Sequence, residues 1–356
     1  MTDKYSKDRF SAKDAQELAH LIAFGPVAFQ ITRTMLKEGI FDFLRSCGGG
    51  CTVSAVAAET GLSEYAAKIL LESSLTLGTV LLNDGKYTLS KVGWFMLTDP
   101  MLRVNIDFNH DINYKGMFHL GEALRSGKPA GLREIGPWKT IYEGLSQLEG
   151  AEKEAWFGFD HFYSDNSFDQ ALPLVFSGKP GRILDIGGNT GKWAMKCVEY
   201  DSEVRVTIAD LPGQIAMMRE NVAGTPGCDR IDGVGVDMLD ARTELPSGYG
   251  VVWMSQFLDC FSEDEVVGIL GKAACALEPE GRIFIMETLW DRQKYRAAAF
   301  DLAQTSVYFT VMANGNSKMF NTEDLSRCIN RAGLTIDRVT DGLGYAHSLF
   351  ECVPAK

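Results

Sequence analysis

Apolar positions along the first hundred residues recur at helical spacing in three stretches. The first covers residues 14–44, the second residues 52–61 and the third residues 63–77, with glycines between them and Ser63 as a helix cap. Two short β-prone segments follow, joined by Asn83-Asp84-Gly85, which is a strong hairpin signal. Three helical stretches followed by a hairpin predict a mainly helical winged-helix domain over residues 1–100.

After residue 178 the pattern changes to short apolar runs that alternate with helical stretches. Residues 101–178 are expected to be helical and are rich in aromatics, and Pro180-Gly181 marks a break. Strands alternating with helices indicate an α/β domain over residues 179–356, with a doubly wound, mostly parallel sheet. The last two runs are expected to form an antiparallel pair. The expected strands are 182–186, 205–209, 233–238, 251–255, 283–287, 334–339 and 348–353.

Composition narrows the possible partners. The 356 residues include 35 Lys and Arg against 47 Asp and Glu, a formal charge of −12 without a basic run, so nucleic acid is not expected as a partner. There is no uncharged apolar stretch of about eighteen residues, so we expect no membrane span. The polar start of the chain and eight scattered cysteines predict a cytoplasmic protein with reduced thiols. The five histidines are isolated, so no metal is expected.

The strongest motif follows the first strand of the α/β domain. An apolar run ends in Asp185, and a glycine-rich turn then opens a helix; its candidate cofactor residues are Asp185, Gly187, Gly188, Asn189 and Gly191. A dinucleotide site needs G-x-G-x-x-G, but Asn189 stands where the second glycine belongs. A P-loop needs Gly-Lys-Ser/Thr, but Trp193 follows Lys192. The turn could also be an ordinary strand-to-helix connection, although the acids downstream favour a cofactor site.

Acidic residues end the next two strands as well. Asp210, followed by Leu211, can accept hydrogen bonds from both hydroxyls of a ribose, although it could instead cap the following helix. Asp237 can accept from an adenine amino group and Met238 can pack on the ring, although Asp237 could equally cap a turn. Carboxyl ends of parallel strands share one edge of the sheet, so the three strand ends predict a nucleoside site.

These motifs, taken in order, resemble the cofactor site of the caffeate and hydroxyindole type of small-molecule O-methyltransferases. The winged-helix unit also resembles the dimerisation domain of that family, and together the resemblance covers roughly residues 15–352. It implies a Rossmann-like class I methyltransferase fold and a homodimer. It further implies S-adenosylmethionine as methyl donor, S-adenosylhomocysteine as product, and a hydroxylated, often aromatic, acceptor.

The chain departs from this family pattern at the catalytic base. The family carries Leu-His-Asp-Trp after its fourth strand, and here Asp259 stands in place of the histidine. Glu287 matches the acidic residue that orients the family's base, while a second such acid falls at Phe320. Asp259 and Glu287 are therefore the expected catalytic residues, and repulsion between them would raise one pKa toward neutrality. The family often has a lysine near the adenine. This chain has Ser255 at that position, and we expect Ser255 to line the cofactor site.

Several alternatives stay open from the sequence. Gln256 is counted with the cofactor residues but could be a surface group, and Asp259 could cap a helix or face solvent. One of His110, His119 and His161 could replace the missing base. A same-fold enzyme that hydroxylates or decarboxylates is the second reading of the chain. A DNA-binding regulator is the third, although its recognition helix would carry one Lys and two Glu.

Overall fold

The computed structural model describes residues 5–355, apart from the side chain of Ser164, and divides into two compact units between Asp107 and Phe108. Each unit is described by itself. Within the described residues, no helix combines the length and the apolar character that a membrane crossing requires.

The N-terminal unit is helical with one hairpin. Its core gathers apolar side chains from every helix after α1, including Met35, Phe41, Val56 and Leu71. The expected hairpin is confirmed, because β1 pairs with β2 antiparallel across the Asn83-Asp84-Gly85 turn. The elements are α1 (Ala12–Ala23), α2 (Gly25–Lys37), α3 (Ile40–Ser46), α4 (Val53–Thr60), α5 (Glu64–Thr76), β1 (Val80–Asn83), β2 (Lys86–Leu89), α6 (Lys91–Thr98) and α7 (Pro100–Phe108), which contains the boundary.

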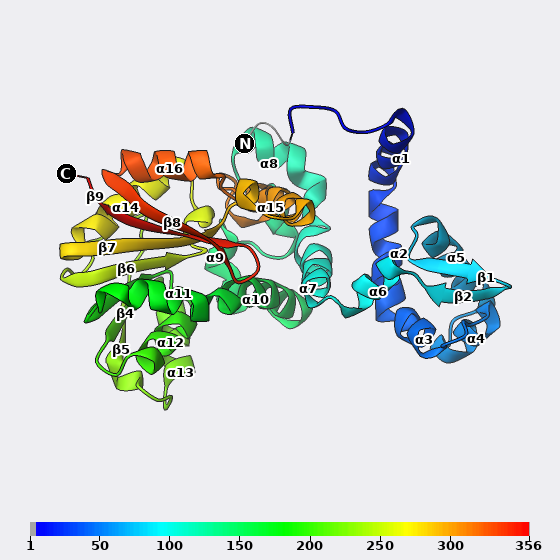
Figure 1. The fold of residues 1–356 in the computed structure, drawn as a ribbon, viewed down its shortest axis with the longest axis horizontal. Helices are drawn as coiled ribbons and strands as arrows, with labels where there is room; N and C mark the ends of the chain where they lie inside the picture. The colour runs from blue at the N-terminus through cyan, green and yellow to red at the C-terminus, as the bar shows by residue number, and fades with distance from the viewer. Residues whose placement is uncertain (1–4, 356) are drawn as a thin grey trace. The chain divides into compact units, whose positions relative to one another are not determined.

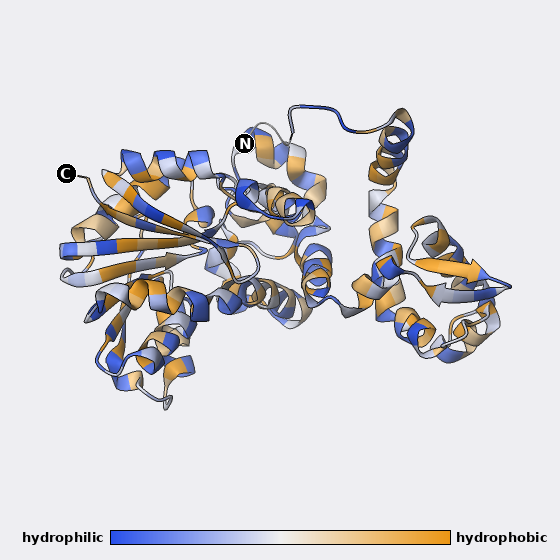
Figure 2. Cartoon of the chain, viewed as in Figure 1, coloured by the Kyte–Doolittle hydropathy of each residue, from blue (hydrophilic) through white to orange (hydrophobic). Residues whose placement is uncertain are grey.

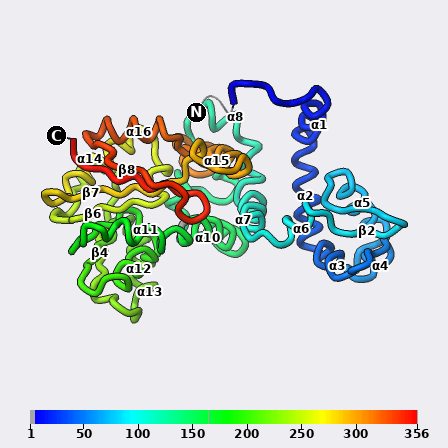
Figure 3. Tube along the Cα trace, in the orientation of Figure 1, coloured from blue at the N-terminus to red at the C-terminus, as the bar shows by residue number. Residues whose placement is uncertain are grey.

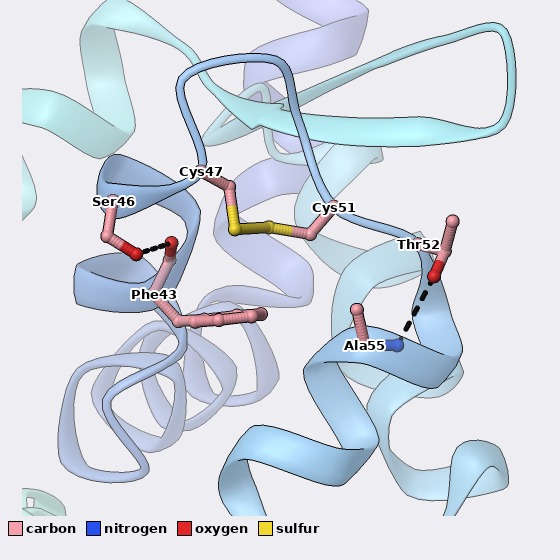
Figure 4. Close-up of a disulfide and its surroundings, with 6 residues drawn as sticks. All are labelled: Phe43, Ser46, Cys47, Cys51, Thr52 and Ala55. Atoms are coloured by element: carbon pink, nitrogen blue, oxygen red, sulfur yellow. Dashed lines mark hydrogen bonds between the residues drawn. A yellow bond between two sulfur atoms is a disulfide. The ribbon is translucent and has the colours of Figure 1, made fainter.

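A disulfide in this unit corrects the expectation that all eight cysteines are reduced. Cys47 and Cys51 are bonded, with their Cα atoms 6.1 Å apart, and Figure 4 shows the bridge. Three successive glycines between them let the chain turn back within four residues. Cys51 also exchanges two backbone hydrogen bonds with Tyr87 of β2. The bridge therefore fixes the loop between α3 and α4, and the hydrogen bonds of Cys51 attach this loop to the hairpin.

A seven-stranded sheet forms the centre of the C-terminal unit, in the order β5-β4-β3-β6-β7-β9-β8. The first five of these strands are parallel, and β9 pairs antiparallel with both β7 and β8, so the expected terminal antiparallel pair is confirmed. Figure 3 follows that last hairpin in red. The strands are β3 (Arg182–Ile186), β4 (Arg205–Asp210), β5 (Ile231–Gly235), β6 (Tyr249–Ser255), β7 (Leu277–Thr288), β8 (Leu334–Leu343) and β9 (His347–Pro354).

Helices cover both faces of this sheet, as Figure 1 shows. One apolar core joins one face to α14 and α16, through side chains such as Val266 and Leu325. The other core joins the opposite face to α11, α12 and α13. Figure 2 shows hydrophobic and hydrophilic residues alternating along the helices that cover the sheet. The bounds are α11 (Phe168–Val175), η7 (Phe176–Gly178), α12 (Lys192–Tyr200), α13 (Pro212–Val222), η8 (Cys228–Arg230), η9 (Leu258–Cys260), α14 (Glu263–Cys275) and α16 (Thr322–Arg331).

A third core is helical and draws on two distant parts of the chain. Phe108, Leu132 and Trp156 pack in it with Leu302 and Met312 from after the fifth parallel strand. This core holds α10 and η11 beside one another. The remaining elements are η2 (Asn109–Asn113), η3 (Gly116–His119), α8 (Leu120–Ser126), η4 (Ala130–Glu134), α9 (Ile141–Gly144), η5 (Leu145–Gln147), α10 (Gly150–Ser164), η6 (Asp165–Ser167), η10 (Trp290–Arg292), α15 (Arg296–Tyr308) and η11 (Phe309–Ala313).

Candidate active site

A cavity of about 390 Å³ lies in the C-terminal unit where the parallel strands end, within the size range of small-molecule sites. It extends from the strand ends to the helical region around α9 and α10. Most of the residues expected to hold a cofactor line it together: Asp185, Gly187, Gly188, Asn189, Asp210, Leu211, Asp237, Met238, Ser255 and Gln256. Gly191 is not among the lining residues and instead precedes α12.

The glycine-rich turn after β3 adopts left-handed backbone angles. Gly187 has φ +76° and Asn189 has φ +47°, a region that asparagine tolerates better than most residues. A Cβ atom on Gly187 would overlap the Phe257 ring, and one on Gly188 would lie 2.6 Å from an Asp185 oxygen. The backbone therefore passes close to its neighbours where it borders the cavity.

Gly187→Ala is expected to lower the free energy of unfolding by about 1–3 kcal/mol and to weaken cofactor binding, because alanine is strained at this φ and its methyl group displaces Phe257. Urea denaturation and calorimetry measure the two effects. Gly213→Ala is the matched control, because a Cβ there meets open space within a helix. Equal behaviour of the two variants would show that the turn tolerates a side chain.

Asp210 joins the second strand end to the glycine-rich turn. One carboxylate oxygen accepts from the Asn189 backbone N–H at 2.9 Å, and the other accepts from the Leu211 N–H at 2.7 Å. Leu211 occupies the N-cap position of α13, so Asp210 is not the helix cap that the sequence left open. Burial raises the pKa of Asp210 to about 6, although the two N–H groups partly oppose this shift. The carboxylate is therefore mostly ionised at neutral pH and can accept from ribose hydroxyls.

Asp237 and Met238 lie beyond the third strand rather than at its end. The expected strand reached residue 238, but β5 stops at Gly235, so this boundary was wrong. Met238 is buried, while Asp237 is exposed and accepts from the Leu239 backbone N–H at 2.8 Å, which is a turn-capping contact. Both residues still line the cavity. Lys272 donates to the Met238 carbonyl at 2.7 Å and fixes this loop.

The chemistry of the cavity wall fits S-adenosylmethionine. The buried polar atoms in the wall that have no hydrogen-bond partner among the described residues include Asp185 Oδ2, Ser255 Oγ, Trp193 Nε1 and Trp253 Nε1. Buried polar groups normally find partners, so these atoms suit a ligand with many polar groups. Carboxylates of Asp185, Asp210 and Asp237 also suit a ligand that carries positive charge and ribose hydroxyls. No group of metal-binding side chains occurs within residues 5–355.

Asp259 and Glu287 lie beside the cavity but do not line it. Both are buried, Asp259 in η9 and Glu287 near the end of β7. Glu287 accepts from the backbone N–H groups of Phe257 (3.2 Å) and Leu258 (2.9 Å), which fixes the segment that carries Asp259. Neighbouring Phe257 and Cys260 do line the cavity, and the Cys260 thiol lies 3.5 Å from an Asp259 oxygen.

Burial is the main cause of the perturbed pKa values at this pair. Burial, opposed by the Cys260 thiol and assisted by the nearby charge of Asp160, raises the pKa of Asp259 to about 7. Burial also raises the pKa of Glu287 well above its usual value, and the Asp259 charge adds to this. Repulsion between the two was the expected cause; it acts on Glu287, where it comes second to burial, and it is not among the causes of the Asp259 shift. Asp259 can therefore gain or lose a proton near neutral pH.

The structure also places residues in the cavity that the sequence did not single out. They come from the region of α9 and α10, from η9 and from the loop after η11: Thr140, Tyr142, Trp156, Asp160, Cys260, Asn314 and Asn316. His161 lines the cavity, whereas His110 pairs with Asp111 and His119 pairs with Glu134. Only the tertiary fold brings these positions together, since helical spacing alone cannot separate core from cavity.

Gln256 is held in place by a buried histidine. Its φ is +47°, and its side-chain oxygen lies 3.0 Å from Nε2 of His347, the first residue of β9. Burial lowers the pKa of His347 to about 4, so the ring is neutral and Nε2–H donates to the amide. Gln256 is thus a cavity-lining group, which resolves the choice that the sequence left open.

Comparison with known proteins agrees with this architecture. Residues 16–87 match the model of the Dimerisation2-like domain, and residues 170–335 match the model of the O-methyltransferase domain. L-tyrosine C(3)-methyltransferase of Streptomyces lavendulae is 25% identical, over 90% of this chain and 87% of that protein. Acetylserotonin O-methyltransferase of Macaca mulatta is 24% identical, over 80% of this chain and 83% of that protein.

A solved structure extends the likeness to nearly the whole fold. The S-adenosylmethionine-dependent methyltransferase SibL is 26% identical and superimposes with a TM-score of 0.72, covering 94% of this chain and 98% of that one. The chain thus combines a Dimerisation2-like domain with an O-methyltransferase domain, and its homologues are S-adenosylmethionine-dependent methyltransferases. It is a methyltransferase, and S-adenosylmethionine is its cofactor.

Proposed function

We propose that this enzyme transfers a methyl group to a hydroxyl of a small aromatic acceptor. The observation that carries the proposal is that one continuous cavity runs from the three strand ends to aromatic side chains beside Asp259. S-adenosylmethionine supplies an electrophilic methyl group on a sulfonium when it is bound. Asp210 holds the ribose, the turn at Gly187–Asn189 borders the amino-acid portion, and Met238 packs on the adenine.

The wall opposite the strand ends suits a planar acceptor. Tyr142 and Trp156 present aromatic surface to the cavity from the helical region, and aromatic rings pack well on one another. Phe257 and Phe261, from the segment after β6, add aromatic surface on the side of the strand ends. Asp259 is the proposed base: it lies directly behind the lining residue Cys260, so the proton of the acceptor hydroxyl reaches it through a bridging water, and its pKa of about 7 suits proton transfer near neutral pH. Direct displacement at a methyl group depends mainly on alignment, so the cavity positions the hydroxyl oxygen.

Phenols and catechols incubated with S-adenosylmethionine test this function. We expect S-adenosylhomocysteine and a product heavier by one methylene, with the methyl group on oxygen by NMR. A product methylated on ring carbon would favour a second function, and the similarity to the L-tyrosine C(3)-methyltransferase supports including that outcome. A product without the added methylene would point to hydroxylation or decarboxylation.

We also propose that the chain forms a homodimer through α1. None of the α1 residues is buried in the single chain, although its sequence is amphipathic. Ile22 is 70% exposed and Phe24, which follows the helix, is 65% exposed, with Leu21 and Val27 beside them in sequence. Apolar surface of this kind on an unpacked helix is typical of a protein interface. The match to a dimerisation-like domain over the same residues supports this assignment.

Ile22→Asp is expected to weaken self-association at least tenfold, because a charge then has to be buried in an apolar interface. Sedimentation velocity over a range of protein concentrations measures the change. Tyr65→Asp is the matched control, since Tyr65 is equally exposed but lies on α5. Unchanged association of the Ile22 variant would exclude α1 from the interface.

A cytoplasmic location is proposed from the remaining cysteines. Cys197, Cys228, Cys260, Cys275, Cys328 and Cys352 are free thiols. Unpaired thiols in this number are typical of a reducing compartment. The short Cys47–Cys51 bridge is the exception within the described chain.

A further inference from the structure

One carboxylate in the cavity comes from neither a strand end nor the Asp259 segment. Asp160 lies on α10, and it lines the cavity on the side of the glycine-rich turn. Its side chain keeps 28% of its surface accessible. Since the residue also lines the cavity, a ligand in the cavity can reach this carboxylate.

Asn189 connects Asp160 to the cofactor turn. Its side-chain N–H donates to Asp160 Oδ2 at 3.2 Å, and its side-chain oxygen accepts from the Gln214 amide at 2.9 Å. The Asn189 backbone N–H donates to Asp210, which holds the ribose end. One residue therefore orients two carboxylates of the cavity, Asp210 through its backbone and Asp160 through its side chain.

The charges around Asp160 leave it suited to a cation. Burial raises its pKa, while His161, 3.9 Å away, and Lys192 oppose the shift. Lys192 also forms an ion pair with Asp165 at 2.5 Å, so the positive charge of Lys192 is divided between two carboxylates. A second carboxylate at the same turn, Asp185, is buried with one oxygen that has no partner among the described residues. Burial raises the pKa of Asp185 well above its ordinary value, so Asp160 is the more favourable partner for a positively charged ligand group.

We propose that Asp160 binds the ammonium group of the methionine portion of the cofactor. When Asp210 binds the ribose, the methionine portion of the ligand lies beside the glycine-rich turn. Asn189 of this turn donates to both Asp210 and Asp160, so the Asp160 carboxylate lies at the same place. The methionine portion carries the ammonium, whereas the adenine and ribose are uncharged. Asp160 therefore discriminates ligands by their amino-acid portion, and Asn189 acts as the positioning residue for that contact.

Calorimetry with two ligands tests this assignment. S-adenosylhomocysteine carries the ammonium, and 5′-methylthioadenosine lacks the whole amino-acid portion. Asp160→Asn is expected to raise the Kd for S-adenosylhomocysteine at least tenfold and to leave the Kd for 5′-methylthioadenosine within about twofold. Asn189→Gly, which removes the connecting amide, is expected to cause a smaller loss with the same selectivity.

Asp169→Asn is the control, because Asp169 on α11 is an exposed acid that is paired with a lysine, Lys196, but does not line the cavity. It should leave the ratio of the two dissociation constants unchanged. If the Asp160 variant bound both ligands more weakly by the same factor, the proposal would be overturned, and Asp160 would only maintain the structure of the cavity. Unchanged binding of S-adenosylhomocysteine with reduced methyl transfer would also overturn it and place Asp160 on the acceptor. Thermal denaturation confirms that each variant is folded.

Discussion

Asp210→Asn is expected to raise the Kd for S-adenosylmethionine at least 100-fold. The carboxylate can accept both ribose hydroxyls, and each hydrogen bond to a charged group contributes about 1.5–3 kcal/mol. An amide of the same shape offers one acceptor oxygen and no charge, and it also weakens the contact with the Asn189 N–H. Calorimetric titration of both proteins measures the difference.

The same titration over a range of pH gives a second test of Asp210. Its pKa of about 6 is raised from the ordinary value, so the carboxylate is ionised above pH 6 and protonated below it. The ionised form accepts the ribose hydroxyls, so affinity is expected to fall as the pH drops through 6, and this dependence should disappear in the Asn variant. Asp232→Asn is the matched control, because Asp232 is exposed on β5 and does not line the cavity. Equal affinities of the Asp210 variant and the control would remove Asp210 from the cofactor site.

Asp259→Asn is expected to lower kcat by about 10²–10⁴-fold, the usual contribution of a positioned base. The amide preserves the size of the side chain but cannot take a proton. The loss should shrink for acceptors with more acidic hydroxyls, because these lose their proton without help. A series of substituted phenols with S-adenosylhomocysteine as the readout measures this trend.

The pH profile distinguishes a base from a merely structural residue. With a pKa of about 7, Asp259 is ionised above neutral pH, so kcat/KM is expected to rise through pH 7 and then level off. The Asn variant should lose this rise. Asp264→Asn, exposed at the start of α14, is the control, and full activity in the Asp259 variant would contradict the assignment.

Residues that follow one another along the chain were the predictable part of this site. Asp185 and Asp210 end apolar runs, and parallel strands have to bring their carboxyl ends to one edge, so sequence spacing was enough to group them. The same local logic applies to the start of α14, where Ser262 and Glu265 form a full capping box. Short-range rules are enough at such positions because the interacting groups are few residues apart.

Contacts between distant segments could not be predicted in this way. Asp160 reaches the cofactor turn across 29 residues, and His347 reaches Gln256 across 91. Both lie among apolar or aromatic neighbours, so their sequence context indicates only burial. The Cys47–Cys51 bridge was missed because composition indicated the compartment and could not show that the glycines bring the two residues together. The end of β5 was misplaced because Val236 and Met238 extend the apolar pattern beyond the last paired residue.

A crystal structure of the protein with S-adenosylhomocysteine is the most direct measurement of the central claim. The account predicts the ribose hydroxyls within hydrogen-bond distance of the Asp210 carboxylate, the amino-acid end beside Gly187 and Asn189, and the adenine against Met238. A nucleoside bound elsewhere, or a cavity closed by side chains at the strand ends, would contradict it.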